Sequence, residues 1–318
     1  MVNLTTLTTA ALLLLAWRRS HSSSMFNTLE PEQVAEDSSQ FFDLHGIHVH
    51  VKIIGHGTPV LVLLHGFAAS TFTWNKVIER LAQVSTDIAF DRPGFGLTSR
   101  PVEGNWDGSN PYDHDAQADL TIELLDRLGI EKAILVGHSA GGTVATLTAL
   151  RHPDRVESLV LVAPAIYSDL PPPVWLRPVL NQRVVRSVAP FFARAMARAT
   201  TPIMNHAWHD PRRITPDERE GYTQPFRISG WDKSMVEVAR ANRPHDLARQ
   251  LAALTLPVLV ITGDDDRVIP TAESRRLARD LPHAELKEIP DCGHISQEEK
   301  PEEFLQALLP FIARWGAK

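Results

Sequence analysis

Short runs of consecutive apolar residues recur along this chain, and turn residues or segments with helical spacing separate them. The runs cover residues 59–66, 87–90, 133–136, 158–162 and 257–263. A continuous apolar run of this length is typical of a parallel strand with both faces covered, whereas a half-exposed strand alternates apolar and polar residues. This feature constrains the fold most strongly, because parallel strands need long crossover connections, usually helices.

Helical spacing occupies the intervals that such crossovers need. We expect helices over residues 73–81, 114–128, 144–151, 272–281 and 302–315, a further strand over 284–290, and two strands over 39–54 around a His45-Gly46 turn. Strands that alternate with helices form right-handed βαβ units. The sequence therefore predicts an α/β protein with a mainly parallel, doubly wound sheet.

The strand pattern stops between the two halves of this predicted sheet. Residues 165–243 have helical character, are interrupted by several prolines, and form a segment too long for an ordinary loop. We interpret the segment as an inserted helical cap. The predicted organisation is a leader at 1–38, a core formed by 39–164 and 244–318, and the cap at 165–243.

The first part of the leader differs in composition from the rest of the chain. Residues 1–29 contain no aspartate or glutamate, and an apolar stretch at 4–17 precedes Arg18, Arg19 and a serine cluster. The stretch is shorter than the roughly 20 residues that span a bilayer as a helix, and it lacks the positive n-region of a secretory signal. Three interpretations stay open: an organelle transit peptide, a short membrane anchor, or an extension upstream of a start at Met25. An intracellular location is favoured, with organelle targeting or membrane association through residues 1–24.

Composition argues against several classes of protein. The formal net charge is −6, and no run of Lys and Arg interleaved with aromatic residues occurs, which argues against nucleic-acid binding. Cys292 is the single cysteine, so the chain can form neither an intramolecular disulfide nor a cysteine-based zinc site. We expect no cofactor and no metal, and the pattern implies no particular oligomeric state.

A serine, an acid and a histidine follow three of the predicted strands. Ser139 lies in GHSAGG directly after the strand at 133–136, three aspartates follow the strand at 257–263, and His294 follows the strand at 284–290. The carboxyl ends of parallel strands meet at one edge of a sheet. Serine becomes an effective nucleophile when a base takes its proton, and a carboxylate usually orients that base. The order Ser, Asp, His therefore predicts nucleophilic catalysis by Ser139.

The glycines around Ser139 have a mechanical explanation. A sharp strand-to-helix turn forces its central residue into a strained backbone conformation, and flanking glycines leave the room that side chains would occupy. A helix that begins near Ala140 directs backbone N–H groups toward developing negative charge. We expect the second oxyanion donor to be the N–H of Phe67, after the strand that ends in His65-Gly66.

Five motifs together resemble the α/β-hydrolase superfamily: GHSAGG, HGF at 65–67, DRPGFG at 91–96, G-x-x-D-x-x-x-P at 263–270 and GH at 293–294. They occur in that family's order and spacing, over about residues 39–318. The resemblance implies the α/β-hydrolase fold, with Ser139 as nucleophile, His294 as general base and then acid, and Asp266 as the orienting carboxylate. It implies Phe67 and Ala140 as the source of the oxyanion-hole N–H groups.

The identity of the nucleophile narrows the chemistry that the resemblance implies. Epoxide hydrolases and haloalkane dehalogenases of the superfamily carry aspartate where this chain has Ser139, which argues against those activities. We hypothesise a cofactor-free hydrolase that cleaves a carboxylic ester of a small to medium, largely apolar substrate through an acyl-enzyme. A C–C bond hydrolase, a thioesterase, a lactonase, or a ligand receptor with an intact triad and no turnover stay open as alternatives.

Simpler interpretations compete with each catalytic assignment. A packing turn is the alternative for Ser139, and a buried structural histidine is the alternative for His294. Asp264 and Asp265 compete with Asp266, although the spacing to Gly263 and Pro270 favours Asp266. The presence of all three residue types on matching loops argues for the catalytic interpretation.

The predicted cap is both basic and apolar. Residues 171–213 contain seven arginines and a single acid, Asp210, with large apolar residues between them. Amphipathic helices that pack on the core and expose a solvated basic face explain this pattern. The alternative is a lid that docks on an anionic lipid surface or an amphiphilic substrate. The candidate pocket-lining residues of the cap are Trp175, Trp208, Phe226 and Trp231.

Peripheral membrane contact through the leader or the cap predicts binding to anionic vesicles. In a flotation assay, the full-length chain is expected to rise with vesicles that contain anionic lipid and to stay in the dense fraction with neutral vesicles, because the attraction is electrostatic. A full-length chain that rises with neither kind of vesicle would exclude this hypothesis.

Overall fold

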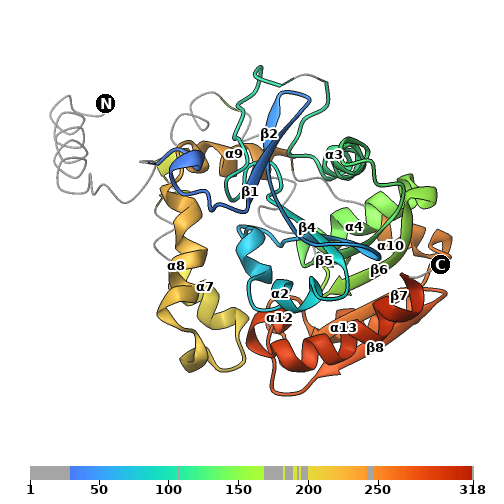
Figure 1. Cartoon of the computed structure of the whole chain (residues 1–318). Coiled ribbons are helices and arrows are strands. Elements are labelled where there is room, and N and C mark those ends of the chain that lie inside the picture. The colour runs from blue at the N-terminus through green and yellow to red at the C-terminus, as the bar shows by residue number, and fades with distance from the viewer. Residues whose placement is uncertain are drawn as a thin grey trace, which may run out of the picture.

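One eight-stranded sheet organises the molecule, in the order β1-β2-β4-β3-β5-β6-β7-β8 (Figure 1). The computed structural model describes residues 29–106, 108–167, 182, 189–191, 193, 194, 200–241 and 246–316. The strands are β1 (Ser39–Leu44), β2 (Ile47–Gly55), β3 (Val60–Leu64), β4 (Thr86–Phe90), β5 (Ala133–His138), β6 (Val156–Val162), β7 (Val258–Gly263) and β8 (Ala284–Ile289). The pairs β1·β2 and β2·β4 are antiparallel, and all other neighbouring pairs are parallel. The prediction of a mainly parallel α/β sheet is confirmed.

Helices cover both faces of the sheet. One face packs against α3 (His114–Arg127), α4 (Ala140–Arg151) and α11 (Thr271–Asp280). The other face packs against α2 (Ile78–Leu81) and α13 (Pro301–Trp315). The other α-helices of the described residues are α7 (Thr200–Ala207), α8 (Pro216–Thr223), α9 (Trp231–Ala241), α10 (Leu247–Gln250) and α12 (Ser296–Glu299). The sheet is therefore doubly wound, as the alternation of strands and helices predicts.

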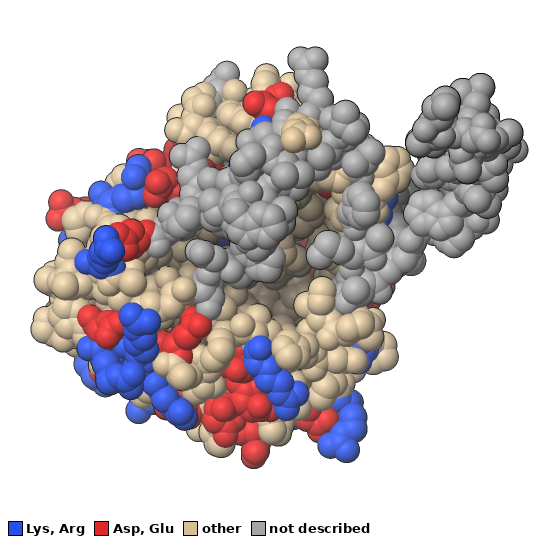
Figure 2. Space-filling view, turned by 180° about the vertical axis from the view of Figure 1, so that it is seen from behind, with Lys and Arg blue, Asp and Glu red and all other residues tan. Residues whose placement is uncertain are grey.

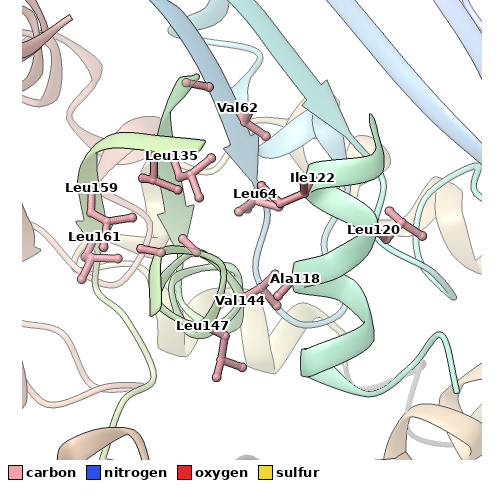
Figure 3. Close-up of a cluster of buried hydrophobic side chains, with 14 of the residues drawn as sticks. Val62, Leu64, Ala118, Leu120, Ile122, Leu135, Val144, Leu147, Leu159 and Leu161 are labelled. Carbon is pink, nitrogen blue, oxygen red and sulfur yellow. The ribbon is translucent and has the colours of Figure 1, made fainter. Parts of the chain in front are cut away.

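The central strands are buried on both faces, which explains their continuous apolar runs. Along β3, Val62 and Leu64 pack in the cluster that includes α3 and α4, as Figure 3 shows. Leu61 and Leu63 alternate with them and pack in the opposite cluster with α2 and α13. All four side chains are fully buried. An alternating polar pattern would expose a charged or polar group to one of these two layers.

One predicted helix differs from its observed form. Residues 73–81 form the end of a 3₁₀ helix at Thr71–Trp74 and the short helix α2. Bonds between residues three apart, such as Val77 N–H to the Trp74 carbonyl, tighten this segment. Trp74, Val77 and Leu81 are nevertheless fully buried, as their spacing predicts.

The parallel registers bring the loops of interest to one edge of the sheet. His138 pairs with Val162 at the ends of β5 and β6, and Gly263 pairs with Ile289 at the ends of β7 and β8. The loops that carry Ser139, Asp266 and His294 all leave the sheet at its carboxyl edge. The sheet thus supplies the placement that nucleophilic catalysis requires.

The segment between β6 and β7 is helical in much of what the structure describes. Helices α7, α8 and α9 belong to it, and in Figure 1 α7 and α8 lie beside α12 at one end of the sheet. Leu29, which the sequence places in the leader, forms an isolated bridge with Ile228 of this segment. Residues 29–38 are therefore tied to the predicted cap, while residues 1–28 lie outside the described part.

Charges of both signs are interspersed on the described surface, as Figure 2 shows for one face. Two described arginines of the basic cap segment are paired with acids: Arg194 with Asp232, and Arg212 with Asp210. These pairs reduce the local positive charge that the sequence predicts. Within the described residues, no helix is long and apolar enough to cross a membrane.

Candidate active site

Ser139 occupies the sharp turn between β5 and α4. Its φ of 52° and ψ of −119° lie in a region that residues with a side chain rarely adopt. A Cβ on Gly137 would lie 2.5 Å from the Gly141 carbonyl oxygen, and a Cβ on Gly141 would lie 2.2 Å from the Leu64 carbonyl oxygen. The Ser139 N–H donates to the Val162 carbonyl at 2.9 Å. The turn therefore requires glycine at both positions and holds the serine in a strained conformation.

Asp266 and His294 form a direct hydrogen-bonded pair. The Asp266 Oδ2 lies 2.8 Å from His294 Nδ1, while its Oδ1 accepts the N–H groups of Val268 and Ile269, both at 2.9 Å. Both side chains are buried. Because an ionised carboxylate only accepts hydrogen bonds, His294 carries its proton on Nδ1 and presents Nε2 as the basic nitrogen. Asp264 instead accepts the Cys292 N–H at 3.2 Å.

His138 connects the serine turn to this pair. Its ring centroid lies 4.7 Å from that of His294, and its Nε2 lies 3.1 Å from the His294 carbonyl oxygen, to which it donates. Burial and the neighbouring His294 hold the pKa of His138 well below its usual value. His138, which directly precedes Ser139, is therefore neutral and packs against the His294 loop.

The loop after β3 approaches Ser139 from the other side. A Cβ on Gly66 would lie 3.0 Å from His138 Nδ1 and 3.2 Å from the Ser139 Cβ, so a larger residue would fit only if these side chains shifted by a few tenths of an ångström. The N–H of Phe67 follows Gly66 directly, and the N–H of Ala140 opens α4 directly after Ser139. The structure brings both predicted oxyanion donors next to the serine turn.

A second Ser–His–Asp array lies elsewhere in the fold, and the sequence pattern gives no signal for it. Ser39 Oγ lies 2.8 Å from His50 Nε2, and His50 Nδ1 lies 2.8 Å from Asp91 Oδ2. Ser39 belongs to β1, and its Oγ also accepts the Glu36 N–H. No strained turn or helix N-terminus accompanies Ser39. We interpret this array as a structural hydrogen-bond chain between strands β1, β2 and the turn after β4.

The buried Glu299 ties the cap to the histidine loop. Its Oε2 accepts the N–H groups of Gly293 at 2.8 Å and His209 at 3.0 Å, and its Oε1 accepts that of Asp210 at 2.9 Å. Gly293 immediately precedes His294, whereas His209 and Asp210 follow α7. One carboxylate thus fixes two segments that are far apart in the sequence.

The same part of the cap also contacts the acid loop. The His294 N–H donates to the Ala207 carbonyl at 2.7 Å. The His209 Nδ1 lies 2.8 Å from Asp265 Oδ2, and Asp265 is the neighbour of Asp266. The end of α7 therefore touches both loops that supply the predicted base and acid.

The structure describes three of the four candidate pocket-lining residues. Trp208 is 1% exposed and packs between α7 and Ile295, beside the His294 loop. Phe226 and Trp231 pack against each other with ring centroids 4.9 Å apart, and Trp231 is 3% exposed. Trp175 lies outside the described residues. A role of these residues in binding substrate stays a prediction.

No group of three or more His, Cys, Asp or Glu residues in the described part of the chain is arranged to hold a metal ion. Near Ser139, Asp266 and His294 are hydrogen-bonded to each other, and Asp266 also accepts two backbone N–H groups. The chemistry available at this site is nucleophilic attack supported by an acid–base pair and backbone N–H groups.

Comparisons with known proteins agree with this fold. A family model described as the alpha/beta hydrolase fold matches residues 59–301. The chain is 30% identical over 278 residues to the uncharacterized hydrolase YugF of Bacillus subtilis (strain 168), and the match covers 85% of this chain and 96% of that protein. It is 31% identical over 282 residues to a 2-hydroxymuconate semialdehyde hydrolase of Pseudomonas putida, and the match covers 86% of this chain and 93% of that protein.

A solved structure extends the comparison to the whole fold. The structure of a thermophilic esterase from Thermogutta terrifontis is similar with a TM-score of 0.71 and 26% sequence identity. The match covers 88% of this chain and 99% of that chain. The similarity therefore includes the sheet and both layers of helices.

Replacement of Glu299 tests the connection between the cap and the histidine loop. In Glu299→Gln, the amide nitrogen faces at least one of the three N–H groups, so the free energy of unfolding is expected to fall by about 1–3 kcal/mol. Urea denaturation followed by tryptophan fluorescence at about pH 6.5 measures this change.

Glu298→Gln is the matched control for that measurement. Burial raises the pKa of Glu298 to about 8, so at pH 6.5 its carboxyl group is largely neutral and a neutral amide replaces it. The expected change is below about 1 kcal/mol. A larger loss in Glu298→Gln than in Glu299→Gln would contradict the assigned role of Glu299.

Proposed function

The chain belongs to the α/β-hydrolase family, and from this premise we propose that it is a serine hydrolase that cleaves a carboxylic ester of a small to medium, largely apolar substrate. One observation carries the proposal: Ser139 lies in a strained turn at the N-terminus of α4, and the preceding residue, His138, contacts His294 of the hydrogen-bonded Asp266–His294 pair. Strain of this kind is a feature of activated nucleophiles on sharp strand-to-helix turns.

In the first half of the proposed reaction, Ser139 Oγ attacks the ester carbonyl carbon and its proton moves to His294 Nε2. Asp266 keeps the Nδ1 proton in place and stabilises the imidazolium that forms. The carbonyl oxygen becomes an anion that accepts the N–H groups of Phe67 and Ala140. Collapse of this intermediate expels the alkoxide, which takes the proton from His294 and leaves as the alcohol.

In the second half, water replaces the alcohol. His294 Nε2 takes a proton from water as the water oxygen attacks the acyl carbon bound to Ser139. The second tetrahedral anion uses the same two N–H groups. Its collapse breaks the bond to Ser139, which recovers its proton from His294, and the carboxylic acid leaves. The cycle needs no group beyond the residues named and one water molecule.

The surroundings of the site support an apolar ester as the substrate. Phe67 is 44% exposed, and its ring packs edge-on against Phe95 with ring centroids 5.8 Å apart. An exposed aromatic ring beside a predicted oxyanion donor provides an apolar surface for an acyl or alcohol group. The similarity to an esterase of known structure supports the same substrate class.

Replacement of the nucleophile gives the direct test of this function. Ser139→Ala is expected to lower kcat for a p-nitrophenyl ester by at least about 10⁴-fold, because no other group can form the acyl-enzyme. Steady-state hydrolysis of a series of acyl chain lengths measures the loss, and circular dichroism checks that the variant is folded.

Ser39→Ala is the matched control, since it removes the serine of the other Ser–His–Asp array. Its kcat is expected to stay within about twofold of the wild type. Undiminished activity in Ser139→Ala would refute the proposed nucleophile. If the protein turns over a thioester or a lactone but not the oxygen ester with the same acyl group, the proposed substrate class is wrong and a thioester or lactone takes its place.

A further inference from the structure

Arg92 is a buried cation in an unusual environment. It follows β4, and its residue is only 1% exposed. Among the described residues it forms no ion pair; its Nη1 donates to Gln117 Oε1 at 2.9 Å, and its Nη2 donates to the Gly66 carbonyl at 2.9 Å. Burial lowers the pKa of Arg92 to about 9, so the guanidinium stays charged at neutral pH. Burying a charge without a countercharge costs free energy, which calls for a physical explanation.

The adjacent carboxylate does not neutralise this charge by direct contact. Asp91 uses its oxygens to accept the N–H groups of Thr71 and Leu97, both at 2.7 Å, and to bond His50. The polar contacts of Arg92 are thus neutral groups, and one of them is the backbone of the loop that approaches Ser139.

His65 shares the Gly66 carbonyl with Arg92. Its Nε2 accepts the Arg92 N–H at 3.0 Å, so its proton lies on Nδ1, which donates to the Gly66 carbonyl at 2.8 Å. Burial and the Arg92 charge lower the pKa of His65 to about 3, and the ring is therefore neutral. Two donors, one of them charged, hold this single carbonyl oxygen.

The geometry of the peptide bond transmits this contact to Phe67. Because a trans peptide is planar, the Phe67 N–H points opposite to the Gly66 C=O. Fixing the carbonyl with two donors fixes the direction of the N–H. A charge-assisted hydrogen bond to the carbonyl also polarises the amide and strengthens its N–H as a donor.

We propose that Arg92, with His65, is a positioning residue that orients and polarises the Phe67 N–H for the oxyanion of the tetrahedral intermediate. This inference rests on the proposed function. It explains why the chain buries a cation beside the loop after β3: a fixed positive charge in a dry site stabilises a developing anion without reorganisation at the moment of reaction.

A purely structural role for Arg92 predicts a different pattern of effects. A bracing arginine would affect binding of substrate and of tetrahedral analogues equally, through disorder of the loop. An oxyanion-positioning arginine acts only when negative charge develops on the bound oxygen. The two roles separate when a ligand that forms the anion is compared with one that does not.

The test compares two ketones of the same chain. Ser139 Oγ adds to the carbonyl carbon of a trifluoromethyl ketone and its proton passes to His294, which leaves an anionic hemiketal oxygen. The matched methyl ketone binds mainly as the neutral carbonyl compound. Inhibition constants for both ketones, together with kcat and KM for the ester, are measured for wild type, Arg92→Met, Arg92→Lys and Arg100→Met.

Arg92→Met is expected to lower kcat and the affinity for the trifluoromethyl ketone by on the order of 10²-fold, with KM and methyl ketone affinity changed less than threefold. Arg92→Lys keeps a cation without the planar fork and is expected to lose about tenfold in the same two quantities; it decides the question if Arg92→Met does not fold.

Arg100→Met is the matched control, because it removes an arginine of the same loop that donates to the carbonyls of Thr98 and Gly96. Its kcat and both affinities are expected to stay within threefold.

Two results in the folded Arg92 variants would overturn the role of Arg92 and leave the proposed hydrolase function intact. One is an equal loss of affinity for both ketones; the other is an affinity for the trifluoromethyl ketone that equals that of the wild type. If the wild-type protein hydrolyses no ester and binds the trifluoromethyl ketone no more tightly than the methyl ketone, both the proposed function and this inference are wrong.

Discussion

The close contact between the β5–α4 turn and the end of β3 is the constraint on which the candidate site depends. No side chain larger than hydrogen fits at Gly141, because the Leu64 carbonyl oxygen occupies that space. The same contact places Ser139 against the loop that carries Gly66 and Phe67. The parallel register of the sheet then brings the Asp266 and His294 loops to the same edge. Backbone packing, rather than any single polar bond, therefore brings the serine turn next to the loop that carries the proposed oxyanion donor Phe67.

Buried polar groups refine what the backbone packing assembles. Glu299 satisfies N–H groups of both the cap and the histidine loop, and Arg92 satisfies the Gly66 carbonyl of the oxyanion loop. An unsatisfied donor or acceptor inside a protein costs about 1–3 kcal/mol, so each loop has one strongly preferred position. This arrangement links the predicted cap to the proposed acid and base, because the end of α7 contacts the loops of His294 and Asp266.

The sheet and the Asp266–His294 pair were predictable because their signals are local. A strand buried on both faces must be continuously apolar, and residues after parallel strands must share an edge, so the order along the chain suffices. Contacts that depend on register or on the cap have no local signal. The His50–Asp91 contact depends on antiparallel pairing of β2 with β4. Arg92 lies among turn residues, where sequence suggests exposure, and only the fold buries it. The three bonds of Glu299 require the position of α7, which no sequence pattern specifies.

We propose Ser139 as the activated nucleophile of this protein. The most direct measurement is reaction of the wild-type chain with a fluorophosphonate, followed by proteolysis and mass spectrometry to locate the phosphonyl group. We expect one adduct per chain, on the peptide that contains Ser139, since attack by its Oγ expels fluoride while His294 takes the proton. An adduct on Ser39 instead, or no adduct in the folded protein, would contradict it.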